Sequence, residues 1–212
     1  MDYQPLHYIY RAAPGPATRT LLLLHGTGGD ERDLIPLAQG FGSDFNVLSV
    51  RGNVLEGGMP RFFRRLSMGV FDEQDVQFRT HELVYFLTNL ASERGFDLNE
   101  LVALGYSNGA NLIGSTLLLY PELLAGAILL RPMQPLSEVP AGLSSQRQTP
   151  VFFSNGLHDP TVNPAATDRY AQILTAAGFK LTRFDAPASH NLTQQDVDQA
   201  ARWYQQHFPP GK

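Results

Sequence analysis

The chain has 212 residues, of which 43% are hydrophobic and 17% charged, and it contains no cysteine. This size and composition are typical of a compact globular protein, and we expect a single domain over residues 1–212. The formal net charge of −4 argues against a nucleic-acid partner. The missing cysteines exclude disulfides, a thiolate nucleophile and cysteine-ligated metal. The first residues do not resemble a signal peptide, and the apolar runs are too short to span a bilayer, so we expect no membrane association.

Short β-like runs alternate with helical patterns along the chain, which predicts an α/β fold with a mostly parallel sheet flanked by helices. About seven strands are expected, at residues 6–12, 20–25, 46–51, 101–106, 126–131, 150–155 and 180–185. Helices are expected between them at residues 30–39, 73–94, 108–120, 164–177 and 194–207. In the second helix, apolar residues recur at a helical spacing that indicates one buried face, and Asp72 is a suitable N-cap.

Two segments lack a regular pattern. Residues 52–70 contain a Gly-Gly pair and an Arg-rich, Phe-rich stretch, and residues 132–149 are polar and contain prolines. Neither segment is long enough to form a large cap domain. We therefore expect a site that is open or only partly roofed.

The passage Gly105-Tyr106-Ser107-Asn108-Gly109 lies between an apolar run and a helical pattern. Strand, tight turn and helix, in that order, are the context of a G-x-S-x-G nucleophile elbow. The glycines permit a sharp turn that exposes the serine hydroxyl, and the N–H groups that open the next helix favour negative charge. The motif predicts that Ser107 is the nucleophile of a serine hydrolase.

A serine nucleophile needs a neighbouring base, and the base needs a third group that fixes its tautomer. In this fold the chain order is serine, acid, histidine. Asp159 follows the predicted strand 150–155, and His190 follows the last predicted strand, so both lie at carboxyl ends of strands. Asp185 is the competing acid. The competing histidines are His25, His81 and His158.

Acyl transfer also needs N–H donors for the developing oxyanion. We expect one from the backbone of Asn108, directly after the nucleophile. The second is expected from Thr27, in the glycine-rich loop of residues 25–30 that follows the second predicted strand. His25 is expected to brace this loop.

The irregular segment suggests two kinds of pocket chemistry. Four apolar side chains are candidates for an acyl or aryl site: Met59, Phe62, Phe63 and Met68. Three neighbouring side chains could meet an anionic group: Arg61, Arg64 and Arg65. The equal alternative is that the phenylalanines anchor the segment while the arginines lie in solvent or pair with Glu56. No set of residues has the spacing of a metal site.

Four motifs together resemble the bacterial phospholipase/carboxylesterase family of α/β hydrolases, over nearly the whole chain. They are H-G-T-G-G-D at residues 25–30, V-R-G-N at 50–53, G-Y-S-N-G at 105–109 and G-L-H-D-P at 156–160. Residues 59–65 and 78–83 are most similar to the branch associated with hydroquinone and quinone stress. The resemblance implies an α/β-hydrolase fold, a triad of Ser107, Asp159 and His190, and a small cytoplasmic esterase without a cofactor.

The leading hypothesis is a carboxylesterase that acts on short-chain or aryl esters, with a small-molecule ester as its partner. The alternatives are an acyl-thioesterase or lysophospholipase, and a non-catalytic protein that binds aromatic or quinone-like molecules. Acyl-protein thioesterases of the family carry glutamine after the nucleophile, where this chain has Asn108. The oligomeric state is left open, with a homodimer among the alternatives.

Overall fold

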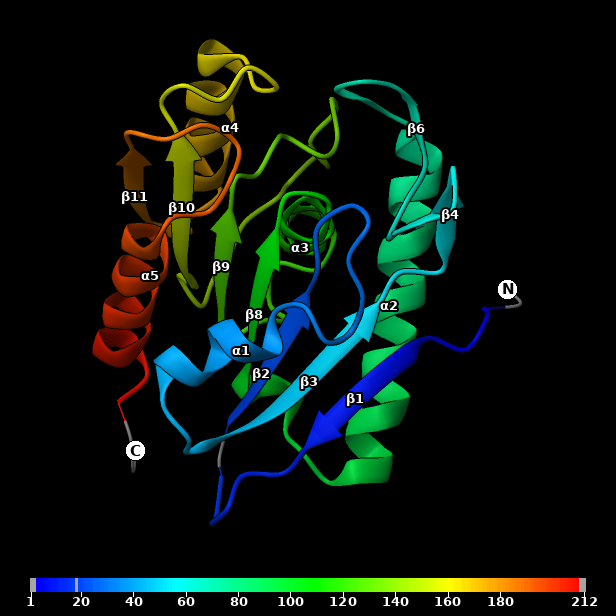
Figure 1. Ribbon diagram of the computed structural model, residues 1–212, viewed down its shortest axis with the longest axis vertical. Coiled ribbons are helices and arrows are strands. Elements are labelled where there is room, and N and C mark those ends of the chain that lie inside the picture. Colours follow the sequence, from blue (N-terminus) through cyan, green and yellow to red (C-terminus); the bar gives the residue numbers. More distant parts are fainter. Residues whose placement is uncertain (1–2, 18, 210–212) are drawn as a thin grey trace.

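Seven strands form one sheet in this computed structural model, which describes residues 3–17 and 19–209 (Figure 1). From one edge to the other they are β1 (His7–Arg11), β3 (Phe45–Arg51), β2 (Arg19–Leu24), β8 (Leu101–Tyr106), β9 (Gly126–Leu130), β10 (Pro150–Gly156) and β11 (Lys180–Ala186). Only β1 is antiparallel to its neighbour. The central strands β2, β8 and β9 are almost entirely buried, because a parallel sheet is covered on both faces. The predicted α/β fold with a mostly parallel sheet of seven strands is confirmed.

Helices cover both faces of the sheet (Figure 1). One face packs against α2 (Glu73–Arg94), α3 (Asn108–Leu119) and α4 (Pro164–Ala176). The other packs against α1 (Ile35–Ala38), the 3₁₀ helix η1 (Gln39–Phe41) and α5 (Gln194–His207). A second 3₁₀ turn, η2 (Leu98–Glu100), leads into β8. The predicted start of α2 is correct, because the Asp72 carboxylate accepts a hydrogen bond from the Asp75 N–H.

Two regions differ from the sequence-based expectation. The helix expected at residues 30–39 is reduced to the short α1, which begins next to Pro36, a residue without an N–H that suits a first turn. Residues 52–70 are not irregular but contain two small hairpins. They are β4 (Val54–Glu56) with β5 (Met59–Arg61), and β6 (Arg65–Ser67) with β7 (Val70–Phe71). Gly57 and Gly58, both at positive φ, make the first turn, as a two-residue hairpin loop requires.

This arrangement places the loops that carry the predicted functional residues at the carboxyl-terminal end of the parallel strands. The strands β8 to β11 all end on this side of the sheet, and the two hairpins lie beside it (Figure 1). Residues 132–149 form turns without helix or strand. Within the described ranges, the structure contains no helix with the length and apolar character needed to cross a membrane.

Candidate active site

Ser107 occupies a sharp turn between β8 and α3. Its backbone has φ 50° and ψ −110°, a region that non-glycine residues rarely adopt. A side chain at Gly105 would clash with the backbone of Gly109 and Ala110, and one at Gly109 would clash with the carbonyl of Leu24. Both glycines of the motif are therefore required by close backbone approach, and the strained turn matches a nucleophile elbow.

The imidazole of His190 lies between the other two predicted catalytic side chains. Its Nε2 is 2.8 Å from Ser107 Oγ, and its Nδ1 is 2.6 Å from Asp159 Oδ2. Because an ionised carboxylate can only accept, Nδ1–H donates to Asp159. In the neutral ring Nε2 is then the acceptor for the Ser107 hydroxyl. This geometry leaves Nε2 able to receive a proton from Ser107.

Asp159 is held by a residue that the sequence reasoning missed. Thr161 donates to Asp159 Oδ1 twice, from its backbone N–H (2.9 Å) and from its hydroxyl (2.6 Å). Burial opposes ionisation of Asp159, but the hydrogen bonds from Thr161 and His190 outweigh it and hold the pKa below its ordinary value. Asp159 is therefore an ionised partner for the imidazole at neutral pH.

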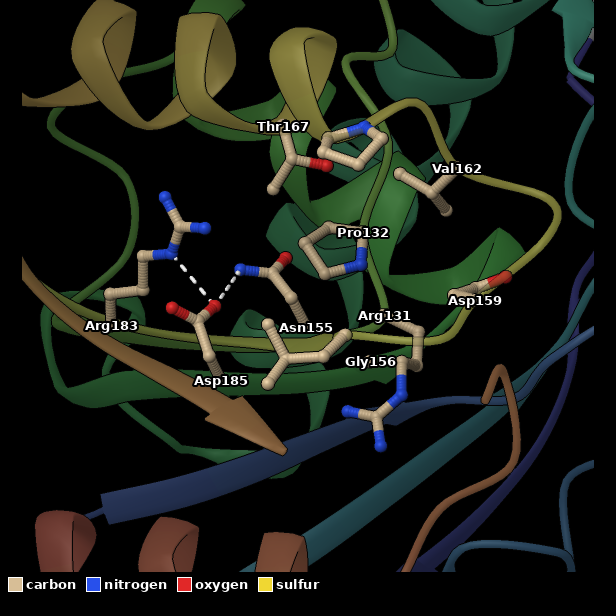
Figure 2. Close-up of a pocket in the computed structure, with 11 residues that line it drawn as sticks. Arg131, Pro132, Asn155, Gly156, Asp159, Val162, Thr167, Arg183 and Asp185 are labelled. Carbon is tan, nitrogen blue, oxygen red and sulfur yellow. Dashed lines mark hydrogen bonds and ion pairs between the residues drawn. The ribbon is translucent and has the colours of Figure 1, made fainter. Parts of the chain in front are cut away.

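The competing acid, Asp185, is committed elsewhere. It accepts hydrogen bonds from Asn155 (2.9 Å) and Arg183 (2.8 Å). Figure 2 shows this group at one side of a small cavity of about 60 Å³, with Asp159 at the other side. Among the described residues, no hydrogen bond or ion pair joins Asp185 to His190. The geometry favours Asp159 as the acid.

The competing histidines are also accounted for. His25 Nδ1 donates to the Gly26 carbonyl (2.6 Å), and Nε2 accepts from the Gly52 N–H (3.1 Å). Burial lowers the pKa of His25, so it is a neutral brace between two loops, as expected. His81 contacts the hydroxyl of Tyr120, and His158 lies on an exposed turn.

The side chains of the two predicted oxyanion donors are bound to Arg61, the last residue of the first hairpin, and to Phe62, which follows it. Arg61 donates to the Thr27 hydroxyl (2.8 Å), and the Asn108 side chain accepts from the Phe62 N–H (2.7 Å). Within residues 3–17 and 19–209, the backbone N–H groups of Thr27 and Asn108 donate to no protein acceptor. Thr27, Asn108, Ser107 and His190 line one pocket of about 230 Å³. Both N–H groups therefore belong to residues that line this pocket and have no protein acceptor among the described residues.

Only one of the four apolar residues predicted for the pocket lines it. Met68 does so, whereas Phe62 and Phe63 are in the core, with exposed fractions of 3% and 0%. Phe62 packs on the ring of His25, and Phe63 packs on Phe71. Met59 lies on the surface beside the glycine-rich loop. The prediction for Phe62 and Phe63 is corrected, because the alternative that they anchor the segment describes their position.

The three arginines were expected either to meet an anionic group in the pocket or to lie in solvent or pair with Glu56, and the structure places them differently. Arg64 is exposed and pairs with Asp72 at 3.0 Å, outside the pocket lining. Arg61 and Arg65 line the pocket, and both lie close to Glu56, at 3.2 and 2.8 Å.

A buried arginine that the sequence reasoning also missed supports the His190 loop. Arg131, at φ 55° after β9, donates to the carbonyls of Ser189 and Asn191, on either side of His190. Its guanidinium forms a two-pronged ion pair with Asp196 at 2.8 Å, and neither side chain is exposed. A charged residue directly after an apolar strand was the available signal.

A comparison with protein families identifies the family of this chain. A family model described as phospholipase/carboxylesterase matches residues 10–208. The chain belongs to this hydrolase family. The family and the α/β-hydrolase fold expected from the sequence motifs are therefore confirmed.

Similar proteins include bacterial and fungal hydrolases. The chain is 42% identical to the putative hydrolase MhqD of Bacillus subtilis over 192 residues, 91% of this chain and 95% of that protein. The crystal structure of a Bacillus cereus carboxylesterase superposes with a TM-score of 0.91 at 44% identity, covering 96% and 95% of the two chains. Acyl-protein thioesterase 1 of Cryptococcus neoformans is 24% identical over 216 residues, 88% of this chain and 91% of that protein.

Proposed function

We propose that this hydrolase cleaves small carboxylic esters, of short-chain or aryl type, through an acyl-enzyme on Ser107. The observation that carries the proposal is the position of His190, within hydrogen-bond reach of both Ser107 and Asp159. A weak hydroxyl nucleophile, a base and an orienting carboxylate are the three groups that such a reaction needs.

In the first half of the reaction, Ser107 Oγ attacks the ester carbonyl carbon while His190 Nε2 takes the hydroxyl proton. The carbonyl oxygen becomes an oxyanion and accepts hydrogen bonds from the N–H groups of Thr27 and Asn108. The carbon–oxygen bond to the alcohol then breaks, and the imidazolium gives its proton to the departing oxygen. Asp159 stabilises the imidazolium and keeps Nδ1 protonated throughout.

In the second half, water attacks the acyl carbon and gives a proton to His190 Nε2. The bond between the acyl carbon and Ser107 Oγ breaks, and the proton returns to the serine oxygen. The products are the carboxylic acid and the free enzyme. Every proton transfer in this scheme passes through Nε2 of His190.

The size of the pocket supports a small substrate. Its volume of about 230 Å³ is below the roughly 300–1,000 Å³ that pockets for drug-sized ligands occupy. A long-chain thioester or lysophospholipid is the alternative within the family, supported by the distant thioesterase relative. Hydrolysis of p-nitrophenyl esters from C2 to C16 separates the two: we expect a maximum at C2 to C6, and a maximum at C12 or longer would favour the alternative.

The test of the nucleophile is Ser107→Ala. We expect p-nitrophenyl acetate turnover to fall about 10⁴-fold or more, with an unchanged circular dichroism spectrum. The matched control is Ser43→Ala, an exposed serine outside the pocket, which should retain full activity. A fluorophosphonate should label the native protein and the control but not Ser107→Ala. If the native protein is not labelled, and binds aromatic ligands without turning over esters, the non-catalytic alternative is favoured over this proposal.

A further inference from the structure

The wall of the catalytic pocket is positively charged. Arg61 and Arg65 line it, and no aspartate or glutamate does so in the part of the chain that is described. Glu56, outside the lining, is the one carboxylate paired with either guanidinium in that part of the chain. Two cations share one anion there, which leaves a net charge of about +1 on this wall of the pocket; the ionised Asp159 pairs separately with His190.

The shared carboxylate satisfies the two arginines unequally. Arg65 Nε donates to Glu56 Oε1 at 2.8 Å, and this hydrogen bond lowers the pKa of Glu56. Arg61 Nη1 lies 3.2 Å from Glu56 Oε2, but Oε2 is buried and accepts no hydrogen bond within the described residues. The pair between Arg61 and Glu56 is therefore a charge contact without hydrogen-bond alignment.

Both guanidinium groups keep free donors. Arg61 donates through Nε to the Phe63 carbonyl and through Nη1 to Thr27, whereas its Nη2 has no acceptor among the described residues. Arg65 uses Nη1 on the thioether of Met68, a weak acceptor, and its Nη2 is likewise without an acceptor there. The Arg61 side chain is only 4% exposed, so little water solvates its charge.

These conditions favour an added anion. The free Nη2 atoms of Arg61 and Arg65 are not buried, so a carboxylate in the pocket can accept charge-assisted hydrogen bonds from them. Burial lowers the pKa of Arg61, and the nearby charge of Arg65 lowers it further, so the two cations repel. The planar guanidinium matches the two oxygens of a carboxylate.

We infer that the pocket selects esters that carry a second, ionised carboxylate, which Arg61 and Arg65 bind while the ester carbonyl lies at Ser107. This inference rests on the proposed esterase function of the same site. Because Arg61 also contacts Thr27, a predicted oxyanion donor, the spacer between the carboxylate and the ester carbonyl is short. Half-esters of small dicarboxylic acids, such as succinyl esters, meet these requirements.

The direct test compares mono-4-nitrophenyl succinate with its methyl ester, in which one methyl group removes the carboxylate charge and the 4-nitrophenyl ester is unchanged. After subtraction of the spontaneous rate, we expect kcat/KM for 4-nitrophenol release to be about tenfold higher for the charged ester at low salt. The preference should shrink as sodium chloride is added, because salt screens charges in an open pocket.

Three variants assign the preference to these side chains. Arg65→Gln should lower the ratio of kcat/KM for the charged to the neutral ester by about tenfold. Glu56→Gln should raise the ratio, because it removes the competing carboxylate. Arg64→Gln is the matched control, with the same charge change outside the pocket, and should keep the native ratio. A merely structural role for Arg65 would slow both esters together and leave the ratio unchanged, which would overturn the inference.

A binding measurement separates this inference from the esterase proposal. Succinate titrated calorimetrically into Ser107→Ala should bind, and should bind more weakly when Arg65→Gln is added. If the enzyme hydrolyses neutral esters but shows no preference for the charged ester and does not bind succinate, this inference is wrong and the esterase proposal stands. If the protein binds succinate but neither hydrolyses esters nor is labelled at Ser107, the esterase proposal is wrong. Tight binding of inorganic phosphate in place of succinate would overturn the choice of a carboxylate.

Discussion

The loop that carries His190 and the hairpin segment of residues 54–71 border the same pocket but are held in different ways. The His190 loop is fixed from beneath by Arg131, whose ion pair with Asp196 is fully buried. The hairpin segment is anchored by Arg61, Phe62 and Phe63, yet exposes large apolar side chains, with exposed fractions from 45% to 73%. These are Leu55, Met59, Leu66, Met68 and Val70.

This difference separates the chemistry from the choice of substrate. The groups proposed to move protons are attached to the buried sheet, where a displacement would disturb the core. The hairpins carry the charged and apolar side chains that we propose meet the rest of the substrate, and most of their surface faces solvent. Substitutions in the first region should therefore cost stability or catalysis, and those on the outer face of the second should cost little.

The largest expected effect on stability is at Arg131. Arg131→Met leaves Asp196 as a buried charge without its partner, which should lower the free energy of unfolding by about 3–5 kcal/mol. The control is Arg183→Met, which breaks a partly exposed ion pair with Asp168 and Asp185 and should cost about 1 kcal/mol or less. Urea unfolding monitored by tryptophan fluorescence measures both. Equal losses in the two variants would show that the His190 loop is not anchored in this way.

At Thr161 we expect a smaller effect, on the rate of catalysis. Thr161→Val removes the hydroxyl bond to Asp159 but keeps the backbone one, so kcat for p-nitrophenyl acetate should fall about tenfold. Thr161→Ser should restore most of the rate. No loss in Thr161→Val would mean that the hydroxyl does not position Asp159.

The same variant has a consequence for pH dependence. The folded-state pKa of Asp159 is below its ordinary value of 3.8. Its ionised form therefore adds stability above pH 3.8, and this stability is lost as the pH falls through the lowered pKa. Thr161→Val raises that pKa toward 3.8, so the difference in free energy of unfolding between pH 7 and pH 3 should be smaller than in the native protein. A larger difference would contradict the assignment.

The smallest effect is expected on the outer face of the hairpins. Leu66 is 73% exposed and lies outside the pocket lining. Leu66→Ser should change the free energy of unfolding by less than about 0.5 kcal/mol and leave p-nitrophenyl acetate turnover within about twofold. A decrease of several kcal/mol in the free energy of unfolding would show that Leu66 makes stabilising packing contacts, and would remove the contrast between the two regions.

The sheet, its helices and the serine turn could be predicted because their signals are local. Apolar runs, helical periodicity and a glycine on each side of Ser107 are all readable within a few residues. The prediction that Asp159 and His190 lie near Ser107 followed from their positions after parallel strands, which end at one edge of the sheet.

The missed features depend on tertiary contacts. The hairpin strands are only two or three residues long, so they show no period. Phe62 and Phe63 give the same apolar signal whether they line a pocket or fill a core. The pair of Arg131 with Asp196 joins residues 65 positions apart, and nothing in either local sequence identifies the partner.

The most direct test of the account is the site of acylation. The native protein is mixed with excess p-nitrophenyl acetate, quenched in acid within milliseconds, digested and analysed by mass spectrometry. The account predicts one acetyl group per chain, on Ser107, and none there in His190→Ala under the same conditions. Acetylation at another residue, or steady turnover with Ser107 never modified, would contradict it.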